Sequence, residues 1–522
     1  MSQTKTEEPM SHRQILEALS GLLLVLFVAM VSSTIVSTAL PKIIGALNGT
    51  QGQYTWVVTA TLLTATASTP IWGKLADLYS KKLLVQISIV IFVVGSIVAG
   101  LAQNAGELIA ARAFQGIGVG GLQALVQVVI AAMIPPRERG RYNGYLGGVM
   151  AVATVGGPLL GGVIVDTSWL GWRWCFFVGV PIAVIALIVL QKTLHVATLR
   201  RDNVRIDYLG ASLIAAGVST LLIWVSFVDS SFAWLSWQTF AMVGAGLVLL
   251  AFAVLVEARA AEPVVPLDIV RQRTTALSII ASLAVGMAMF GGAVFLGQYF
   301  QIGRGYTPTE AGLLTIPLMA GVLGASIVVG RLITRSGNIK PYIVAGTVIL
   351  VLGFAALATI DHETSLVFVG AAMLLVGIGV GSSMQNLVLA VQNTVPLKDI
   401  GAASSTIAFF RSLGGTIGVS VLGAVLARRV TENIAHGLAA AGVPAGAGSS
   451  GTSNLNLNAL PPAMQHIVRA AYGDATGHIF LISAGIAIVG VIAAALMKPT
   501  ALRSTLDLTA PTEPEKVPAT TR

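Results

Sequence analysis

The stretch that decides the fold begins Leu108-Ile-Ala-Ala-Arg112-Ala-Phe-Gln115-Gly116-Ile-Gly-Val-Gly120 and continues to Gly162. Its glycine run, Gly116 to Gly120, returns letter for letter as Gly377-Ile-Gly-Val-Gly381. The same shift along the chain pairs three further glycines: Gly140 with Gly401, Gly157 with Gly418, and Gly162 with Gly423. An internal repeat at this separation predicts two related halves, each a bundle of helices.

The composition is that of a membrane protein. Of the 522 residues, 55% are hydrophobic and 10% are charged, whereas a soluble domain carries about 25% charged residues. The 57 glycines fit membrane helices, in which small residues let backbones approach closely. The single Cys175 excludes an intrachain disulfide, and the six histidines show no ligand spacing along the sequence, so we expect no metal and no cofactor.

Fourteen apolar segments each approach the ~20 residues that cross a ~30 Å hydrocarbon layer. They lie at 18–40, 55–75, 83–101, 107–132, 143–165, 174–191, 207–228, 238–256, 276–300, 311–333, 341–360, 366–391, 404–427 and 478–497. We therefore predict an all-α integral membrane protein with 14 transmembrane helices. Residues 1–14 and 501–522 are predicted to be disordered tails. Residues 429–476 are predicted to form a long outer loop with a mobile centre, Ala439 to Ser453, and more helix-like flanks.

Basic residues decide the predicted orientation. Lys and Arg gather in every second connection, for example at Lys81, Lys82 and in Arg137-Glu-Arg-Gly-Arg141. Because cytoplasmic loops carry the excess of Lys and Arg, both termini are predicted to be cytoplasmic. The net charge of +9 is then a topology signal, and nucleic acid is not expected as a partner.

A charged motif follows the second apolar segment and reads Gly73-Lys-Leu-Ala-Asp77-Leu-Tyr-Ser-Lys81-Lys82. Its glycine allows close approach of helices, and its aspartate can face the positive N-terminus of a helix from the other half. A degenerate copy in the second half reads Gly330-Arg-Leu-Ile-Thr-Arg335-Ser-Gly337. The alternative interpretation is a charged loop that only sets topology.

Two further motifs lie inside predicted spans. Arg112 lies about five residues into the fourth segment, where it either snorkels to the outer surface or has a function that justifies a charge in the membrane. Proline kinks a helix by removing one backbone hydrogen bond, and glycines admit a crossing helix. The fifth segment combines these residue types at Gly144, Gly157, Pro158 and Gly161.

Together these motifs resemble the major facilitator superfamily, in its fourteen-span multidrug/proton antiporter branch. The resemblance covers nearly all of residues 15–500. It implies the major facilitator fold, with a six-helix bundle at 15–195, two inserted linker helices at 196–270 and a second six-helix bundle at 271–500. It also implies a cytoplasmic gate made of Gly73, Asp77, Lys81 and Lys82.

The resemblance implies a secondary active multidrug efflux transporter of the cell membrane. Such a protein, expected to be a monomer, exports hydrophobic or amphiphilic small molecules by proton antiport with alternating access, driven by the proton gradient. The fifth-helix motif favours export, because the family's exporters carry it. The sequence has no Walker lysine loop, and its glycine runs lie inside apolar helices, so an enzyme is not expected.

One position departs from the family pattern. The first segment reads Ser32-Ser-Thr34-Ile-Val-Ser-Thr-Ala-Leu-Pro41, whereas the family form begins with an aspartate that is thought to take part in proton coupling. A hydroxyl does not titrate near neutral pH. The proton-carrying residue is therefore not identified, and the candidates for coupling or for the cavity are Arg112, Ser32, Thr34 and Gln115.

The cavity between the bundles is predicted to carry positive charge. Arg112 and Arg411 lie within spans, and no Asp or Glu lies near the middle of one. If both arginines reach the cavity, it suits neutral, zwitterionic or anionic amphiphiles better than lipophilic cations, although Arg411 could instead snorkel to the cytoplasmic surface. Further candidates, each of which could equally be an interhelical contact, are Trp56, Gln123, Gln127, Gln298, Gln301, Gln385, Asn386 and Phe409.

Two other functions stay open at this point. One is a dedicated exporter of a lipid or secreted metabolite, with the long outer loop guiding the cargo. The other is a proton- or ion-coupled importer, against which the fifth-helix motif argues. A membrane receptor is a third class, but no part of the sequence forms a separate ligand-binding or signalling domain.

Overall fold

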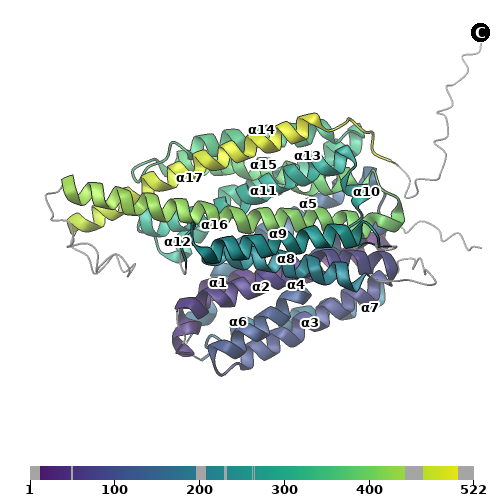
Figure 1. Cartoon of the computed structure of the whole chain (residues 1–522), viewed down its shortest axis with the longest axis horizontal. Helices are drawn as coiled ribbons and strands as arrows, with labels where there is room; N and C mark the ends of the chain where they lie inside the picture. Colours follow the sequence, from purple (N-terminus) through teal and green to yellow (C-terminus); the bar gives the residue numbers. More distant parts are fainter. Residues whose placement is uncertain are drawn as a thin grey trace, which may run out of the picture.

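Long, roughly parallel helices make up the computed structural model (Figure 1). It describes residues 12–48, 51–167, 169–194, 207–228, 232–260, 263, 265–440 and 462–503. Within these ranges there is no strand, and the two β-bridges, Val228 with Phe232 and Asn338 with Ala501, are isolated. The all-helical prediction is therefore confirmed for the described chain.

The helices follow one another with short connections. Their bounds are α1 His12–Ala46, α2 Gln51–Leu78, α3 Lys81–Leu101, α4 Ala105–Met133, α5 Pro136–Asp166, α6 Trp174–Phe177, α7 Gly179–Thr193, α8 Tyr208–Phe227, α9 Trp237–Glu257, α10 Leu267–Val270, α11 Arg273–Gln298, the π-helical turn η1 Tyr299–Gly303, α12 Pro308–Leu314, α13 Ile316–Ser336, α14 Lys340–Leu357, α15 Leu366–Gln392, the 3-10 turn η2 Leu397–Asp399, α16 Ile400–Ala440 and α17 Pro462–Leu496.

Ten helices of the described chain are long and apolar enough to cross a membrane. Several begin where a side chain caps the free backbone N–H groups of the first turn. Asn104 accepts a hydrogen bond from the Glu107 N–H at the start of α4, and Thr307 and Glu310 form a capping box at the start of α12.

The repeated glycine run packs in the same way in both halves. A Cβ added to Gly116 would lie 2.5 Å from the carbonyl oxygen of Thr61 in α2, and one added to Gly118 would lie 2.7 Å from the Phe92 nitrogen in α3. Their counterparts lie on α15. A Cβ added to Gly377 would lie 2.0 Å from the carbonyl oxygen of Leu318 in α13, and one added to Gly379 would lie 2.6 Å from the Cβ of Leu350 in α14. In each half the glycines thus let the fourth helix of the repeat pack closely between the second and third helices, which are α2 and α3 for α4, and α13 and α14 for α15.

The two largest clusters of buried apolar residues each belong to one half. One joins α1, α2, α3, α4, α5 and α7, and the other joins α11 and its successors up to α17. Helices α8 and α9 pack on each other, and α8 also packs on α2 and α16 at the seam between the halves (Figure 1).

The described structure bears on three of the predicted tails and loops. Helix α1 begins at His12, inside the predicted disordered tail 1–14. Helices α16 and α17 extend to Ala440 and from Pro462, so the described flanks of the predicted outer loop 429–476 are helical, and residues 441–461 are not among those described. At the C-terminal end, the residues from 501 to 503 are held by hydrogen bonds, whereas residues 504–522 lie outside the described chain.

Candidate functional site

The carboxylate of Asp77 joins the two halves of the molecule. Asp77 lies at the end of α2, and its two oxygens accept hydrogen bonds of 2.7 Å each from the N–H groups of Gly401 and Ala402 in the first turn of α16. The N-terminus of a helix carries partial positive charge and free N–H donors, so it is a good partner for a carboxylate. The predicted role of this aspartate therefore has a matching geometry.

Glycines make this contact possible. A Cβ added to Gly73 would lie 1.9 Å from Ser405 Oγ and 2.7 Å from the Gly401 carbonyl oxygen. A Cβ added to Gly401 would lie 2.3 Å from the carbonyl oxygen of Gly73. Helices α2 and α16 therefore cross backbone to backbone, with Asp77 one turn beyond the crossing point.

The two lysines of the motif take different places. Lys81 is buried beside Asp77 and interacts with it electrostatically. Lys82 instead donates a 2.7 Å hydrogen bond to the carbonyl oxygen of Gln191 near the end of α7. It thus ties α3 to α7 within the first half, and the contact between the halves is made by Asp77.

A second crossing mirrors the first. A Cβ added to Gly140 on α5 would lie 2.5 Å from the carbonyl oxygen of Gly330 on α13. Gly330 heads the copy of the charged motif, as Gly73 heads the original, and Gly140 is the repeat partner of Gly401. The two crossings are thus copies of each other, one on either side of the seam.

Only the crossing of α2 and α16 has an acidic residue that caps a helix of the other half. We call this contact, Asp77 with the N–H groups of Gly401 and Ala402, the Asp77 latch. Thr334 occupies, in the copy, the place of Asp77. Its hydroxyl donates back to the Gly330 carbonyl oxygen in its own helix, at 3.0 Å, and does not cap α5. The carboxylate of Asp77 therefore caps α16, and the residue at the matching place in the copy does not cap α5.

Arg139 adds a polar link between the halves at the same end. Arg139 is 2% exposed, and its guanidinium donates to the Ile134 and Ala131 carbonyl oxygens and, at 2.8 Å, to Gln392 Oε1 on α15. Burial and then the charge of Arg503 lower the pKa of Arg139 to about 9, so it stays charged at neutral pH. The sequence alone predicts this arginine to be a topology signal only.

Arg112 is buried rather than snorkelled. It is 3% exposed on α4, and its Nη1 donates to Gln115 Oε1 one turn further on. Gln115 Nε2 donates in turn to Ser96 Oγ on α3, at 2.7 Å. Gln115 therefore orients the guanidinium, whose Nε has no hydrogen-bond partner in the described chain.

The first-helix and fifth-helix motifs meet each other. A Cβ added to Gly157 on α5 would lie 1.8 Å from Thr34 Oγ1 on α1, and this hydroxyl also bonds the Ala153 carbonyl oxygen at 3.3 Å. Gly144 faces the other way, toward Ile327 on α13. Helix α5 thus packs on its own half through Gly157 and on the other half through Gly144.

The remaining motif positions add less. Ser32 is buried on α1, and its hydroxyl has no hydrogen-bond partner among the described residues. Gly161 is buried on α5. Pro158 lies within α5, but its side chain is outside the described residues.

The polar candidates for the cavity fall into two groups. Gln127 on α4 donates a 2.7 Å hydrogen bond to Gln385 on α15, which is a direct polar contact between the halves. The neighbouring Asn386 is buried and bonds the Ser382 carbonyl oxygen in its own helix. The others are half-buried or exposed: Gln123 is half-buried, and Gln298 and Gln301 are exposed.

The aromatic candidates face the inserted helices. Trp56 packs on Phe227 of α8 with ring centroids 4.9 Å apart, and Phe409 belongs to an apolar cluster with Val218 of α8 and Ala253 of α9. Arg411 lies two residues further along α16, and its buried Nη1 has no hydrogen-bond partner in the described chain. The sequence does not say where an inserted helix pair docks, so these contacts could not be predicted.

A family model described as the Major Facilitator Superfamily matches residues 22–419. The chain belongs to the major facilitator superfamily. The predicted membership of this superfamily is thereby confirmed, and the protein is a transporter rather than an enzyme.

Curated relatives of this major facilitator chain carry transporter names. It is 35% identical over 475 residues to an uncharacterized MFS-type transporter of Mycobacterium tuberculosis, covering 91% of this chain and 68% of the relative. It is 34% identical over 411 residues to the multidrug transporter protein MdtP of Bacillus subtilis, covering 79% and 75%. It is 31% identical over 500 residues to the efflux pump dotC of Dothistroma septosporum, covering 94% and 85%.

Solved major facilitator structures show the same fold. The proton:xylose symporter XylE matches with a TM-score of 0.60 and 15% identity, covering 92% of this chain and 95% of that chain. The human organic anion transporter MFSD10 matches with a TM-score of 0.59 and 12% identity, covering 91% and 99%. At these identities the likeness concerns the fold alone.

Proposed function

We propose that this transporter is a secondary active multidrug efflux protein. It exports hydrophobic or amphiphilic small molecules by proton antiport with alternating access. Relatives named as a multidrug transporter and as an efflux pump, at 34% and 31% identity, support this direction and cargo. So does the glycine and proline motif of α5, which resembles that of the family's exporters.

The observation that carries the proposal is the Asp77 latch on α16. A hydrogen bond to a charged group contributes roughly 1.5–3 kcal/mol net, so the two bonds together bias the equilibrium between a closed and an open end by about a hundredfold or more. Contacts of this size hold a state and can still be broken in each cycle. In the proposed mechanism they close the cytoplasmic side while the opposite side releases substrate.

The membrane arrangement belongs to the same proposal. The protein has 14 transmembrane helices in the cell membrane, with both termini in the cytoplasm. Bundles at 15–195 and 271–500 rock about the seam, and the inserted pair within 196–270 covers one side of it through α8. The Asp77 end is the cytoplasmic end, which fits the basic residues Arg137, Arg139 and Arg503 found there.

The proposed substrate class follows from unbalanced positive charge. Arg112 and Arg411 lie on α4 and α16, which pack against each other. Each has a buried guanidinium nitrogen without a hydrogen-bond partner in the described chain. Such an environment favours neutral, zwitterionic or anionic amphiphiles over lipophilic cations.

Proteoliposome transport tests the coupling. An imposed pH gradient, with protons moving inward through right-side-out protein, should drive accumulation of a fluorescent drug on the outer side. Collapse of the gradient by an ionophore should abolish it. Transport that continues at the same rate without any pH gradient would exclude proton antiport for this chain, in which Ser32 replaces the family's aspartate.

A dedicated exporter of a secreted metabolite is the second candidate. It is favoured by a relative described as the Acurin A biosynthesis cluster MFS-type transporter of Aspergillus aculeatus, 30% identical over 405 residues and covering 76% of this chain and 73% of the relative. Drug-susceptibility profiles of cells with and without the gene separate the two. Raised tolerance to several unrelated drugs supports multidrug efflux, and an unchanged profile supports the dedicated exporter.

A further inference from the structure

Three possible metal ligands meet at the end of the molecule opposite to the Asp77 latch. His362 and Glu363 lie in the connection between α14 and α15, and His466 lies in the second turn of α17. Their ligand atoms all lie within 4.8 Å of one another. The two histidines are far apart in the sequence, which is why no ligand spacing was visible there.

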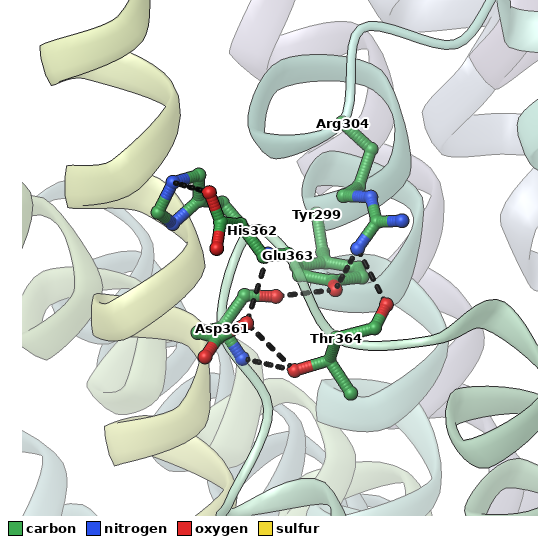
Figure 2. A network of polar contacts seen from close by, with 6 residues as sticks. All are labelled: Tyr299, Arg304, Asp361, His362, Glu363 and Thr364. Carbon is green, nitrogen blue, oxygen red and sulfur yellow. Dashed lines mark hydrogen bonds and ion pairs between the residues drawn. The ribbon is translucent and has the colours of Figure 1, made fainter.

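The connection that carries two of the ligands is rigidly held. Asp361 Oδ1 accepts hydrogen bonds of 2.8 Å from both the Thr364 hydroxyl and the Glu363 N–H. Tyr299 and Arg304 bond its backbone, at 2.7 Å to the Asp361 carbonyl oxygen and 2.6 Å to that of Thr364. Figure 2 shows this network, with the His362 and Glu363 side chains directed away from it toward α17.

Helix α17 is fixed against the same connection. A Cβ added to Gly473 would lie 2.5 Å from the backbone nitrogen of His362 and 2.9 Å from its Cα, so only glycine lets α17 come this close. His466 lies seven residues before Gly473, which is two helical turns on the same face. The imidazole of His466 is thereby presented to His362, and the ring centroids lie 5.3 Å apart, edge to face.

The His362 ring lacks the partners that a buried imidazole usually has. Both of its nitrogens are shielded from solvent without a hydrogen-bond partner in the described chain. The Glu363 carboxylate, at 3.8 Å, is too distant for a hydrogen bond. Buried polar nitrogens without partners are costly, and a metal ion that accepts the lone pair of the unprotonated nitrogen removes that part of the cost.

We propose that His362, Glu363 and His466 form a binding site for a divalent transition-metal ion, with Zn²⁺ the best match, that clamps the start of α17 to the α14–α15 connection. Imidazole is a good ligand for zinc, copper, iron and nickel ions, whereas Mg²⁺ and Ca²⁺ prefer oxygen ligands alone. Two nitrogens and one carboxylate oxygen leave a fourth tetrahedral position for water. The exposed side chains of Glu363 and His466 can rotate to close the remaining distance.

Calorimetric titration of the full-length protein in detergent, with any histidine tag removed, tests the site. Zinc should bind with a stoichiometry of one and magnesium should not. Even the loss of an outer-shell partner typically weakens metal sites by about 10–100-fold, so His362→Gln and His466→Gln should each weaken zinc binding by at least about tenfold. His436→Gln, which changes an exposed histidine of α16 outside the cluster, is the matched control and should bind as the wild type does.

Two further measurements keep the outcome interpretable. His466 is exposed, so the metal-free melting temperature of His466→Gln should equal that of the wild type, and zinc should raise only the wild-type value. X-ray absorption should show two imidazole nitrogens at about 2.0–2.1 Å from the zinc. No zinc binding, or binding that His362→Gln and His466→Gln leave unchanged, overturns the proposal. Neither readout depends on transport, so it stands or falls separately from the efflux function.

Discussion

Gly330 lies so close to Gly140 that a Cβ added to Gly330 would stand 1.8 Å from the Gly140 carbonyl oxygen. At this point α13 and α5 therefore cross backbone to backbone. Its repeat partner is the crossing of Gly73 and Gly401, so both sides of the seam close on a pair of glycines. A closed end that depends on two such contacts tolerates no added atom at either of them.

Gly330→Ala should therefore prevent this end from closing. The added methyl group forces the two helices apart by more than an ångström, because real Cβ contacts below 3.0 Å essentially do not occur. We expect drug export to fall by about tenfold or more, which corresponds to roughly 1.4 kcal/mol in the equilibrium between closed and open states.

Gly324→Ala is the matched control on the same helix. No atom lies within 4 Å of a Cβ added to Gly324, so export should stay at the wild-type rate. Both variants are compared at equal membrane expression. If Gly330→Ala exports as fast as Gly324→Ala, the closed crossing has no part in transport.

Asp77→Asn should weaken the latch without removing its bulk. The amide keeps one acceptor oxygen but turns an NH₂ group toward a backbone N–H, so one of the two bonds is lost and the charge with it. Export should fall by about tenfold or more. In a Cys175→Ser background, a reporter at Gln127→Cys should become more reactive toward maleimide from the cytoplasmic side.

Glu138→Gln provides the comparison for this prediction. Glu138 is an exposed acidic residue in the first turn of α5, at the same end of the molecule. It should leave both export and maleimide labelling unchanged. A loss of export in Glu138→Gln as large as that in Asp77→Asn would assign the effect to surface charge.

The motifs of the sequence predicted contacts where both partners belonged to a repeated pattern. Gly73 and Asp77 could be assigned to a helix contact because the charged motif recurs and because a carboxylate at a helix end seeks the N-terminus of another helix. That Asp77 bonds Gly401 and Ala402 follows from the fold, since these residues lie more than 300 positions away along the chain.

Residues outside the motifs could not be placed from the sequence. Arg139 looks like any basic loop residue until Gln392 and the C-terminal Arg503 are brought beside it. His362 and His466 share no pattern, and only the close approach of Gly473 brings them together. Such contacts depend on tertiary packing, which cannot be predicted from the spacing of residues along the sequence.

Gly157→Ala tests whether the fifth-helix motif acts through Thr34. The added methyl group would meet the Thr34 hydroxyl at 1.8 Å and its Cβ at 2.5 Å, so α1 and α5 must separate. We expect export to fall by about tenfold. The neighbouring Gly156→Ala adds the same methyl group where no atom lies within 4 Å, and it should be silent. Equal losses in the two variants would point to helix propensity instead of the contact with α1.

Arg112→Gln tests whether the buried positive charge selects the substrate. Arg112 bonds Gln115, which Ser96 holds in turn, so the guanidinium has a fixed place while one of its nitrogens lacks a partner. Removing the charge should lower export of an anionic amphiphile by about tenfold or more and leave an uncharged drug within about twofold. Arg112→Lys keeps the charge without the planar fork and should recover part of the anion export. Vesicle transport of an anionic, an uncharged and a dicationic fluorescent substrate, measured side by side, decides the matter. A wild-type protein that prefers the dication, or an Arg112→Gln variant that loses all three substrates equally, would show that this arginine does not set charge selectivity.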